Sequence, residues 1–392
     1  MGGGGRAIAR MKKLSFWYFL FIISGFAVCA QLVGFYIPLY FREIGLKGIH
    51  AGMFFAVSTV ANLILSLPMG VATDRKSIRI ILFVSFVLVA LSYVGFIISD
   101  ALLVICSFAL AGGFGKKFFA VSSNTMFFKL SGTNSLRNAA LFMLLRTVSM
   151  GVGTIIGGFL IDMLSYRHVF FLTVGGNLLL AGLSMGLPRT ENVAIELAEY
   201  RRTVLTPKVL FLAAVFSLSS MHWGAEMVAY SPFLKHNLGL PIPHLGIFTG
   251  TGFMLVGVGS ILGAFALKKR WVSSLRQVLI IGLILSGVFH VLMCIPVLYV
   301  SYACRLFHEI GDGLVMLAFY SGIPKVFHID KIGGCAAFMG LCMGVTAMGS
   351  SVAFGHIGDV WGHQWPLIIS GIVLASIPLL LKLGGDLLGE AQ

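Results

Sequence analysis

The sequence has few charged residues for its length. Asp, Glu, Lys and Arg make up 11% of the 392 residues, whereas a soluble domain has about 25%. Hydrophobic residues make up 58%, and the mean hydropathy is +0.97. So little charge cannot cover a folded surface with polar groups. The composition therefore excludes a soluble globular protein and indicates a chain that crosses a membrane several times.

Sequence motifs for covalent or metal chemistry are also missing. The six cysteines lie in apolar runs, without the paired spacing of a zinc site or the polar surroundings of a disulfide framework. The chain has no Walker motif, no metal-ligand motif and no nucleophile elbow. We therefore expect no metal, no cofactor, no ATP-driven transport and no enzymatic activity.

Acidic residues are half as frequent as basic ones. The 14 Asp and Glu against 28 Lys and Arg give a net charge of +14, which alone would suggest nucleic-acid binding. When the N-terminus is placed in the cytoplasm, most basic residues fall in inner segments. The outer segments hold only Arg42, Lys47, Arg167 and Lys235. We interpret the excess as a topology signal and expect no nucleic-acid partner.

Twelve apolar runs are long enough to span a lipid bilayer, because a span needs about 20 mostly apolar residues. They cover residues 16–41, 51–73, 80–98, 101–128, 139–163, 169–187, 209–234, 245–267, 278–296, 299–323, 333–357 and 365–383. We predict an all-α membrane protein with both termini in the cytoplasm. The inner (plasma) membrane of a bacterium is the expected location, and the functional unit is expected to be a monomer.

The two halves of the chain share a repeated pattern. Tyr36-x-Pro38 recurs as Tyr230-x-Pro232, and His50-x-Gly52-x-Phe54 recurs with the same offset as His244-x-Gly246-x-Phe248. We therefore predict two pseudo-symmetric six-helix halves in the same membrane orientation. Residues 1–187 form the N-terminal half, residues 188–207 a cytoplasmic linker with a helix-like middle, and residues 208–392 the C-terminal half.

A short charged connection separates the second and third apolar runs. It resembles the Gly-x-x-x-Asp-Arg-x-x-x-Arg signature of the major facilitator superfamily, whose positions are filled here by Gly70, Asp74, Arg75 and Arg79. Ser77 stands where the family usually has glycine. The resemblance implies a secondary transporter with its site between the two halves, and it implies that these four residues form a conformational latch. The alternative is a basic loop that only sets topology.

The tenth run has the highest density of ionisable residues within a predicted span. Arg305, His308, Glu309 and Asp312 have i, i+3, i+4 and i+7 spacing, so they share one helix face. Because ionisable groups are costly in the bilayer, this face is a candidate for a proton relay or a substrate site. The alternative is an Arg305–Glu309 ion pair that only stabilises the fold.

The seventh run repeats this pattern with His222 and Glu226 at i and i+4. Some proton-coupled members of the superfamily have acidic residues in these two spans, which makes Glu226 with Glu309 or Asp312 the candidate coupling group. His222 alone also fits a packed histidine. The predicted proton-coupling residues are therefore Glu226, Glu309, Asp312, His222 and His308.

Cations inside the N-terminal half are candidate substrate ligands. Lys116 and Lys117 are adjacent and point about 100° apart, so at most one faces the cavity centre. The predicted substrate-binding residues are Lys116, Lys117, Arg146, Arg305, Gln31, Asn124 and Trp223. The cations fit either an anionic or zwitterionic substrate or ion pairs with carboxylates of the other half. The uncharged residues fit helix packing equally well.

These features predict a secondary active transporter that moves a small organic solute, with an anion as one candidate, by alternating access coupled to protons. A proton-driven exporter of amphiphilic compounds is the alternative, suggested by the many Phe and Met residues. A non-transporting sensor on the same fold would need an added soluble domain. The expected partners are the substrate, protons and the lipid bilayer.

The latch hypothesis predicts the effect of one isosteric change. Asp74→Asn should impair transport and leave membrane insertion intact, because the loop loses its charge but keeps its shape. Flux in reconstituted liposomes, compared at equal amounts of inserted protein, checks this. Wild-type turnover by the variant would reduce the loop to a topology signal.

Overall fold

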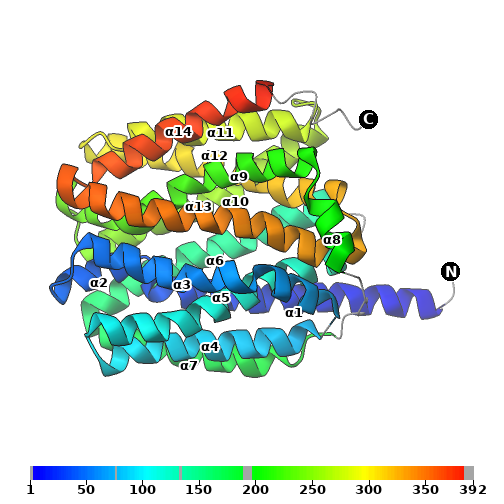
Figure 1. Cartoon of the computed structure of the whole chain (residues 1–392), viewed down its shortest axis with the longest axis horizontal. Helices are drawn as coiled ribbons and strands as arrows, with labels where there is room; N and C mark the ends of the chain where they lie inside the picture. The colour runs from blue at the N-terminus through cyan, green and yellow to red at the C-terminus, as the bar shows by residue number, and fades with distance from the viewer. Residues whose placement is uncertain (1–2, 76, 132–134, 189–196, 384–392) are drawn as a thin grey trace.

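A computed structural model describes residues 3–75, 77–131, 135–188 and 197–383 as an almost wholly helical bundle (Figure 1). The first part contains α1 (Gly3–Gly34), α2 (Ile37–Glu43), α3 (Gly48–Arg75), α4 (Ile78–Ile98), α5 (Leu102–Ser131), α6 (Ser135–Leu164) and α7 (Tyr166–Ser184). After α8 (Leu197–Val204) come α9 (Pro207–Ala225), η1 (Glu226–Tyr230), η2 (Phe233–Asn237), α10 (Ile242–Lys268), α11 (Leu275–Leu292), α12 (Leu298–Val326), η3 (Ile329–Lys331), α13 (Ile332–Trp361) and α14 (Gln364–Leu383).

Each of the twelve predicted spans corresponds to a helix or to consecutive helices. In the described part of the chain, nine helical segments are long and apolar enough to cross a membrane. Three further helices, α3, α7 and α12, also match predicted spans. Helix α3 contains the apolar stretch Gly48–Val60, and α12 carries three charged side chains in its middle. Helix α8 lies within the predicted linker.

The helices pack in two sets, with α1 and α3–α7 in one and α9–α14 in the other (Figure 1). The sets meet mainly where α6 packs on α10 and where α3 packs on α13. The second long helix of each set thus meets the fifth of the other, which agrees with the repeat in the sequence. The domain boundaries at residues 187 and 208 remain a prediction.

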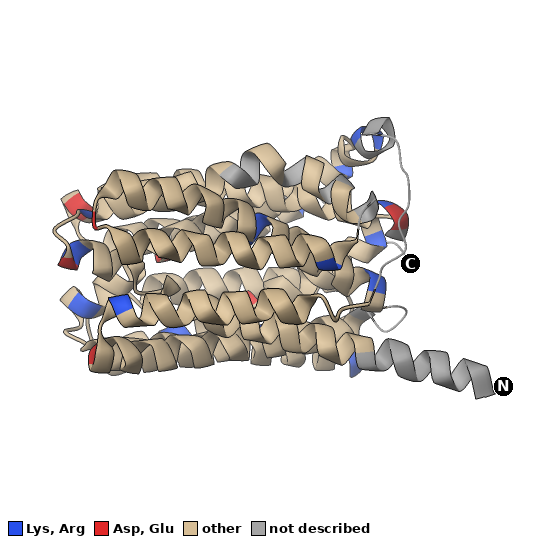
Figure 2. Cartoon of the chain, turned by 90° about the horizontal axis from the view of Figure 1, so that it is seen from below, with Lys and Arg blue, Asp and Glu red and all other residues tan. Residues whose placement is uncertain are grey.

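Charged residues lie mostly toward the two ends of the bundle, with fewer between them (Figure 2). The start of α1, the short helix α8 and the end of α14 all lie at the same end of the bundle (Figure 1). The arrangement is the one that a bilayer imposes, because ionisable groups are costly at its centre. The ionisable residues that do lie between the ends therefore need a specific explanation.

Helices α10 and α12 approach closely because glycine faces glycine. A Cβ atom on Gly313 would lie 2.8 Å from the backbone nitrogen of Ser260 and 2.9 Å from the Cα of Gly259. The Ser260 hydroxyl donates to the Gly313 carbonyl over 2.8 Å. Small residues allow such contacts between membrane helices, and here the contact fixes the middle of α12.

The seventh span widens from an α-helix to π-helical turns where it reaches Glu226. Helix α9 begins with Pro207 after Thr206, whose hydroxyl accepts from the Val209 amide over 3.4 Å. From Glu226 to Tyr230, in η1, the chain forms i→i+5 turns. Such turns are rare and occur frequently at functional sites, because the extra residue redirects the side chains that follow.

At the end of the bundle opposite α8, Asp359 of α13 joins the two sets. Its carboxylate accepts from the backbone amides of Gly48 (3.3 Å) and Ile49 (3.0 Å) at the start of α3, and it pairs with Arg42 over 3.2 Å. A helix N-terminus attracts an anion in this way. Burial and the nearby Arg42 charge lower the pKa of His363 to about 4, so His363 is neutral near pH 7 and adds no charge here.

Candidate functional site

Arg305 lies in a cluster of ionisable side chains between α9, η1, α11 and α12. The residue is 1% exposed, and its guanidinium forms ion pairs with both Glu226 and Glu309. It also lies 4.2 Å from the centroid of the Tyr230 ring, a cation–π contact. A single arginine therefore neutralises only one of the two carboxylates that it contacts.

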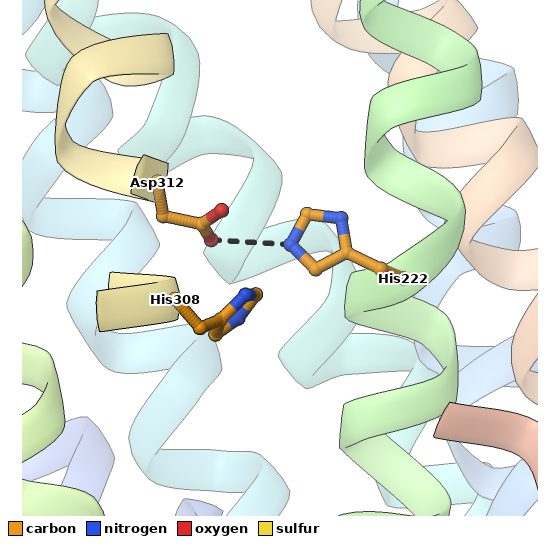
Figure 3. A group of neighbouring side chains, drawn as sticks. All are labelled: His222, His308 and Asp312. Atoms are coloured by element: carbon orange, nitrogen blue, oxygen red, sulfur yellow. Dashed lines mark hydrogen bonds and ion pairs between the residues drawn. The ribbon is translucent and has the colours of Figure 1, made fainter. Parts of the chain in front are cut away.

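Asp312, one helical turn from Glu309, has its own set of partners. Its Oδ1 accepts from the Ser286 hydroxyl over 2.6 Å, and its Oδ2 accepts from the Trp223 indole N–H over 3.2 Å. The His222 Nε2 atom lies 3.1 Å from the same Oδ2 (Figure 3). Every carboxylate of the cluster thus has at least one polar partner.

The two histidines that face these carboxylates each donate to the backbone through the other ring nitrogen. His222 Nδ1 hydrogen-bonds to the Ser219 carbonyl, and His308 Nδ1 hydrogen-bonds to the Ser286 carbonyl over 2.9 Å. A carbonyl can only accept, so both Nδ1 atoms carry hydrogen. The His308 Nε2 atom lies 3.1 Å from Glu226 Oε1. Because a carboxylate also only accepts, each imidazole needs a second proton to complete its contact.

A third histidine, His290, is fixed as a neutral ring. Its Nε2 lies 3.2 Å from the Ser370 hydroxyl, which donates its own hydrogen to the Leu367 carbonyl over 3.1 Å. His290 Nε2 is then the donor, and Nδ1 is left as an acceptor that lies 3.4 Å from His308 Nε2 and 3.5 Å from Glu226 Oε1. His290 therefore supports a protonated His308.

With these protons the charges of the cluster balance. Glu226, Glu309 and Asp312 contribute three negative charges, and Arg305 with protonated His222 and His308 contributes three positive charges. Loss of both protons would leave a net charge of −2 in a medium of low dielectric constant, where unpaired charges are costly. In this geometry a second proton on each of the two histidines would balance the charges of the cluster.

Two overlapping sets of side chains have the types and spacing that a metal ion requires. Within each set, the possible ligand atoms lie within 4.8 Å of one another. One set is His222, His308 and Asp312 (Figure 3), and the other is Glu226, His290 and His308. The carboxylates already have partners, because Arg305 pairs with Glu226 while Trp223 and Ser286 donate to Asp312. A guanidinium beside a metal cation would repel it. These contacts fit two protons better than a metal ion, and the absence of a metal stays a prediction.

A cavity of about 290 Å³ lies beside the cluster, between the two sets of helices. Its polar lining comes from Lys117 and Asn124 of α5, Arg146 of α6, Trp223 of α9 and Tyr320 of α12. Apolar and small side chains form the rest of its wall: Ala120, Val121, Met316, Phe319, Gly333, Ala336, Ala337, Gly340, Met343, Gly344 and Ala347. The volume lies at the lower end of the range for small-molecule sites.

The two cations of the cavity have no carboxylate partner in the part of the chain that the structure describes. Lys117 is 4% exposed and has no hydrogen-bond or ion-pair partner among those residues. Arg146 donates to the Tyr320 hydroxyl over 3.0 Å, and that hydroxyl donates to the Asn124 side-chain oxygen over 3.3 Å. The cavity thus presents two cationic side chains for which the described residues supply no counter-ion.

The structure separates the predicted residues into two groups. All five predicted proton-coupling residues lie in the cluster, and four predicted substrate residues, Lys117, Arg146, Asn124 and Trp223, line the cavity. Lys116, Gln31 and Arg305 do not line it. Lys116 lies on a different face of α5 from Lys117. Arg305 is paired with Glu226 and Glu309 in the cluster instead.

In the part of the chain that the structure describes, the candidate substrate cations of the N-terminal half do not pair with the carboxylates of the cluster. Among the described residues, no ion pair joins Lys116, Lys117 or Arg146 to a cluster carboxylate. This geometry favours the substrate-binding interpretation of Lys117 and Arg146 over the interpretation as structural ion pairs.

The predicted latch lies mostly outside the described residues. The side chains of Gly70, Asp74 and Arg75 are not described, so the latch can be placed only through Arg79, in the first turn of α4. Its role therefore remains a prediction.

Sequence reasoning missed several residues of the site. His290 and Ser286 lie one helical turn apart on α11, and both contact His308. A histidine in an otherwise apolar run was a usable signal. Tyr320 and Ser370 carried no such signal, because hydroxyl groups are common in membrane helices and their partners come from distant helices.

Comparisons with known proteins identify the fold. The sequence profile of the Major Facilitator Superfamily matches residues 14–275. Among solved structures, the human organic anion transporter MFSD10 (TETRAN) superposes with a TM-score of 0.71 at 13% sequence identity and covers 94% of this chain and 99% of its own. A bacterial homologue of the human lysosomal transporter Spinster, in an inward-facing and unoccupied conformation, has a TM-score of 0.70 at 12% identity, with 96% and 97% covered. No curated protein sequence matches the chain.

The Arg305 ion pairs should contribute strongly to stability. Arg305→Met removes the cation shared by Glu226 and Glu309, and it should lower the free energy of unfolding by about 3–5 kcal/mol, because it leaves buried carboxylates unpaired. Adding Glu309→Gln should recover part of this loss. Thermal unfolding of the purified protein measures both effects.

Arg42→Met provides the control for this prediction. It removes the partly exposed Arg42–Asp359 pair, and it should cost less than about 1 kcal/mol. Equal losses for the Arg305 and Arg42 variants would contradict the account of the cluster.

Proposed function

The chain belongs to the major facilitator superfamily of secondary transporters, and we propose that it carries a small organic anion together with protons. The superfamily consists of multi-pass membrane proteins that move small molecules, so the predictions of the family, of the twelve-helix fold and of a transporter rather than an enzyme are confirmed. The substrate, the coupling ion and the direction of transport form the proposal.

The observation that carries the proposal is the unpaired charge of Lys117. A buried ammonium group without a counter-ion is costly, and Arg146 across the cavity has only the neutral Tyr320 hydroxyl as a partner. A carboxylate or similar anion bound between them would supply the missing charge. The apolar wall, with Met316, Phe319 and Met343, would hold the body of the molecule. MFSD10, an organic anion transporter, shares the fold.

The proton part of the proposal rests on the cluster beside the cavity. Arg305 pairs with two of the three carboxylates, and His222 and His308 complete their contacts to Asp312 and Glu226 only when they are protonated. Opening this region to water would release the protons, because solvation removes the cost of the unpaired charge. Protonation would then change with conformation, which is the requirement for coupling a proton gradient to transport.

We infer the membrane orientation from the basic residues. Those of the N-terminal segment, of α8 and of the α10–α11 connection lie on the side assigned to the cytoplasm. The Asp359 contact would then close the outer side. The expected location is the inner (plasma) membrane of a bacterium, with the monomer as the functional unit.

Export of amphiphilic compounds is the second candidate. It is favoured by the apolar part of the cavity wall, which suits a substrate with a large hydrophobic body. The two candidates share the site and the protons and differ in the direction of the coupled flux. Flux assays in which the pH gradient is imposed in both directions distinguish them.

The cavity cations should select for charge. Lys117→Ala and Arg146→Ala should each weaken the binding of a carboxylate by about 10- to 100-fold, because a hydrogen bond to a charged group contributes about 1.5–3 kcal/mol. Binding of the matching carboxamide should change much less. A panel of monocarboxylates paired with their carboxamides, tested by calorimetry, measures the difference.

Lys116→Ala is the matched control, since it removes the neighbouring lysine that does not line the cavity. It should change carboxylate affinity less than about twofold, well below the effect expected for a charge-assisted contact. Equal losses for the carboxylate and the carboxamide in the Lys117 and Arg146 variants would contradict an anion site.

The cluster carboxylates should be required for uphill transport. Glu226→Gln, Glu309→Gln and Asp312→Asn should remove the accumulation driven by a pH gradient in at least one variant and spare exchange of the anion down its own gradient. Proteoliposome flux with and without the gradient tests each variant. If all three still concentrate the anion, proton coupling is wrong, and a uniporter or a sodium-coupled carrier fits better.

A further inference from the structure

Trp223 contacts both the cavity and the cluster. Its side chain lines the cavity beside Met343 and Phe319, and its indole N–H donates to Asp312 Oδ2 over 3.2 Å. Among the described residues that line the cavity, no other hydrogen-bonds to a carboxyl group of the cluster. Trp223 therefore provides the direct hydrogen-bonded connection between the space for the anion and the protons.

We propose that Trp223 couples anion binding to proton binding by presenting its one N–H either to Asp312 or to the anion in the cavity. The inference rests on the proposed function, because it takes the cavity occupant to be an organic anion. It adds a positioning role for a residue that neither holds the coupling proton nor carries charge.

The sign of the coupling follows from the partners of Asp312 Oδ2. This oxygen faces two donors, the Trp223 N–H and, when His222 is protonated, His222 Nε2. An anion that accepts the indole N–H removes the neutral donor from Asp312, and Asp312 then depends more on the charged one. Anion binding thus favours the protonated form of His222. By linkage, protonation of His222 favours anion binding by the same factor.

Local packing limits how the indole can move. Gly224, the next residue, packs against α13, where an added Cβ atom would lie 2.9 Å from the backbone nitrogen of Ser351. This contact pins the α9 backbone beside the indole. The N–H therefore changes partner by a small side-chain rotation rather than by a shift of the helix.

Other ionisable groups also face Asp312 and influence its titration. From α9 and η1 these are His222 and Glu226, from α11 it is His290, and on α12 itself they are Arg305, His308 and Glu309. The contacts that the described residues of α10 and α14 make near the cluster bring no titratable side chain. The test therefore needs a signal that belongs to Trp223 alone.

The first experiment uses no substrate. The other four tryptophans, Trp17, Trp271, Trp361 and Trp365, are exposed, so replacing them by phenylalanine leaves Trp223 as the single indole. Its fluorescence should change as the pH is raised through the range in which His222 releases its proton. The change should disappear in Asp312→Asn and in His222→Gln, and it should persist in Lys117→Ala. The inference would be overturned if the fluorescence of Trp223 did not change with pH, or if the Asp312 and His222 variants showed the same change as the wild-type residues.

The second experiment measures the coupling with the monocarboxylate that the binding panel selects. In wild-type protein its dissociation constant should fall by at least about fivefold from the alkaline side to the acid side of the Trp223 fluorescence transition, within the usual range of coupling between sites. Trp223→Phe keeps the aromatic ring but removes the donor, and it should reduce this pH dependence to less than about twofold.

Two comparisons make the second result specific. Phe319→Leu also removes ring contacts from the cavity wall, so it should weaken binding and keep the pH dependence. Trp223→Gln, which restores an N–H donor, should recover part of the pH dependence. A wild-type pH dependence in Trp223→Phe would overturn the inference, whereas a panel in which no carboxylate binds would instead overturn the proposed function.

Discussion

The organisation of the C-terminal set of helices depends on three carboxylates that are clustered with a single arginine in the bilayer interior. Arg305 pairs with Glu226 and Glu309, and Asp312 lies one turn further along α12. One guanidinium cannot balance three negative charges, and water is not available to solvate the remainder. The backbone carbonyls of Ser219 and Ser286 fix His222 and His308 so that their second protons provide the missing charge. With both second protons present, as proposed, the packing of these helices depends on bound protons.

The same helices place this cluster beside the cavity. Helix α12 contributes Arg305 through Asp312 to the cluster and, one to two turns later, Met316, Phe319 and Tyr320 to the cavity wall. Helix α9 contributes His222 to one and Trp223 to the other, just before the π-helical turns. The sets of helices are joined at one end by Asp359 on the N-terminus of α3. A change at that contact and a change of protonation therefore act on the same group of packed helices.

Much of the fold was predictable, because the length of each apolar run indicates a membrane span and the internal repeat indicates two equivalent halves. The cluster face of α12 was predictable for a related reason, since i, i+3, i+4 and i+7 spacing places Arg305, His308, Glu309 and Asp312 together whatever surrounds the helix. The choice between Lys116 and Lys117, and the removal of Arg305 from the substrate site, depended on which helices lie opposite, and sequence spacing carries no such information. His290 stands alone in its run, without a second ionisable residue at helical spacing, so only its presence among apolar residues signalled it. The π-helical turns at Glu226 have no recognisable sequence signal.

The central claim is that two histidines of the cluster hold protons when the cluster is closed to water. Nitrogen-15 NMR of the histidine-labelled protein in lipid bilayers tests it directly, because a doubly protonated imidazole differs from a neutral one in its nitrogen shifts. At about pH 8, where exposed histidines are neutral, two of the ten histidines should still be doubly protonated. Both signals should be lost in a protein that carries His222→Gln and His308→Gln. Ten neutral histidines in the folded wild-type protein at that pH would contradict the account.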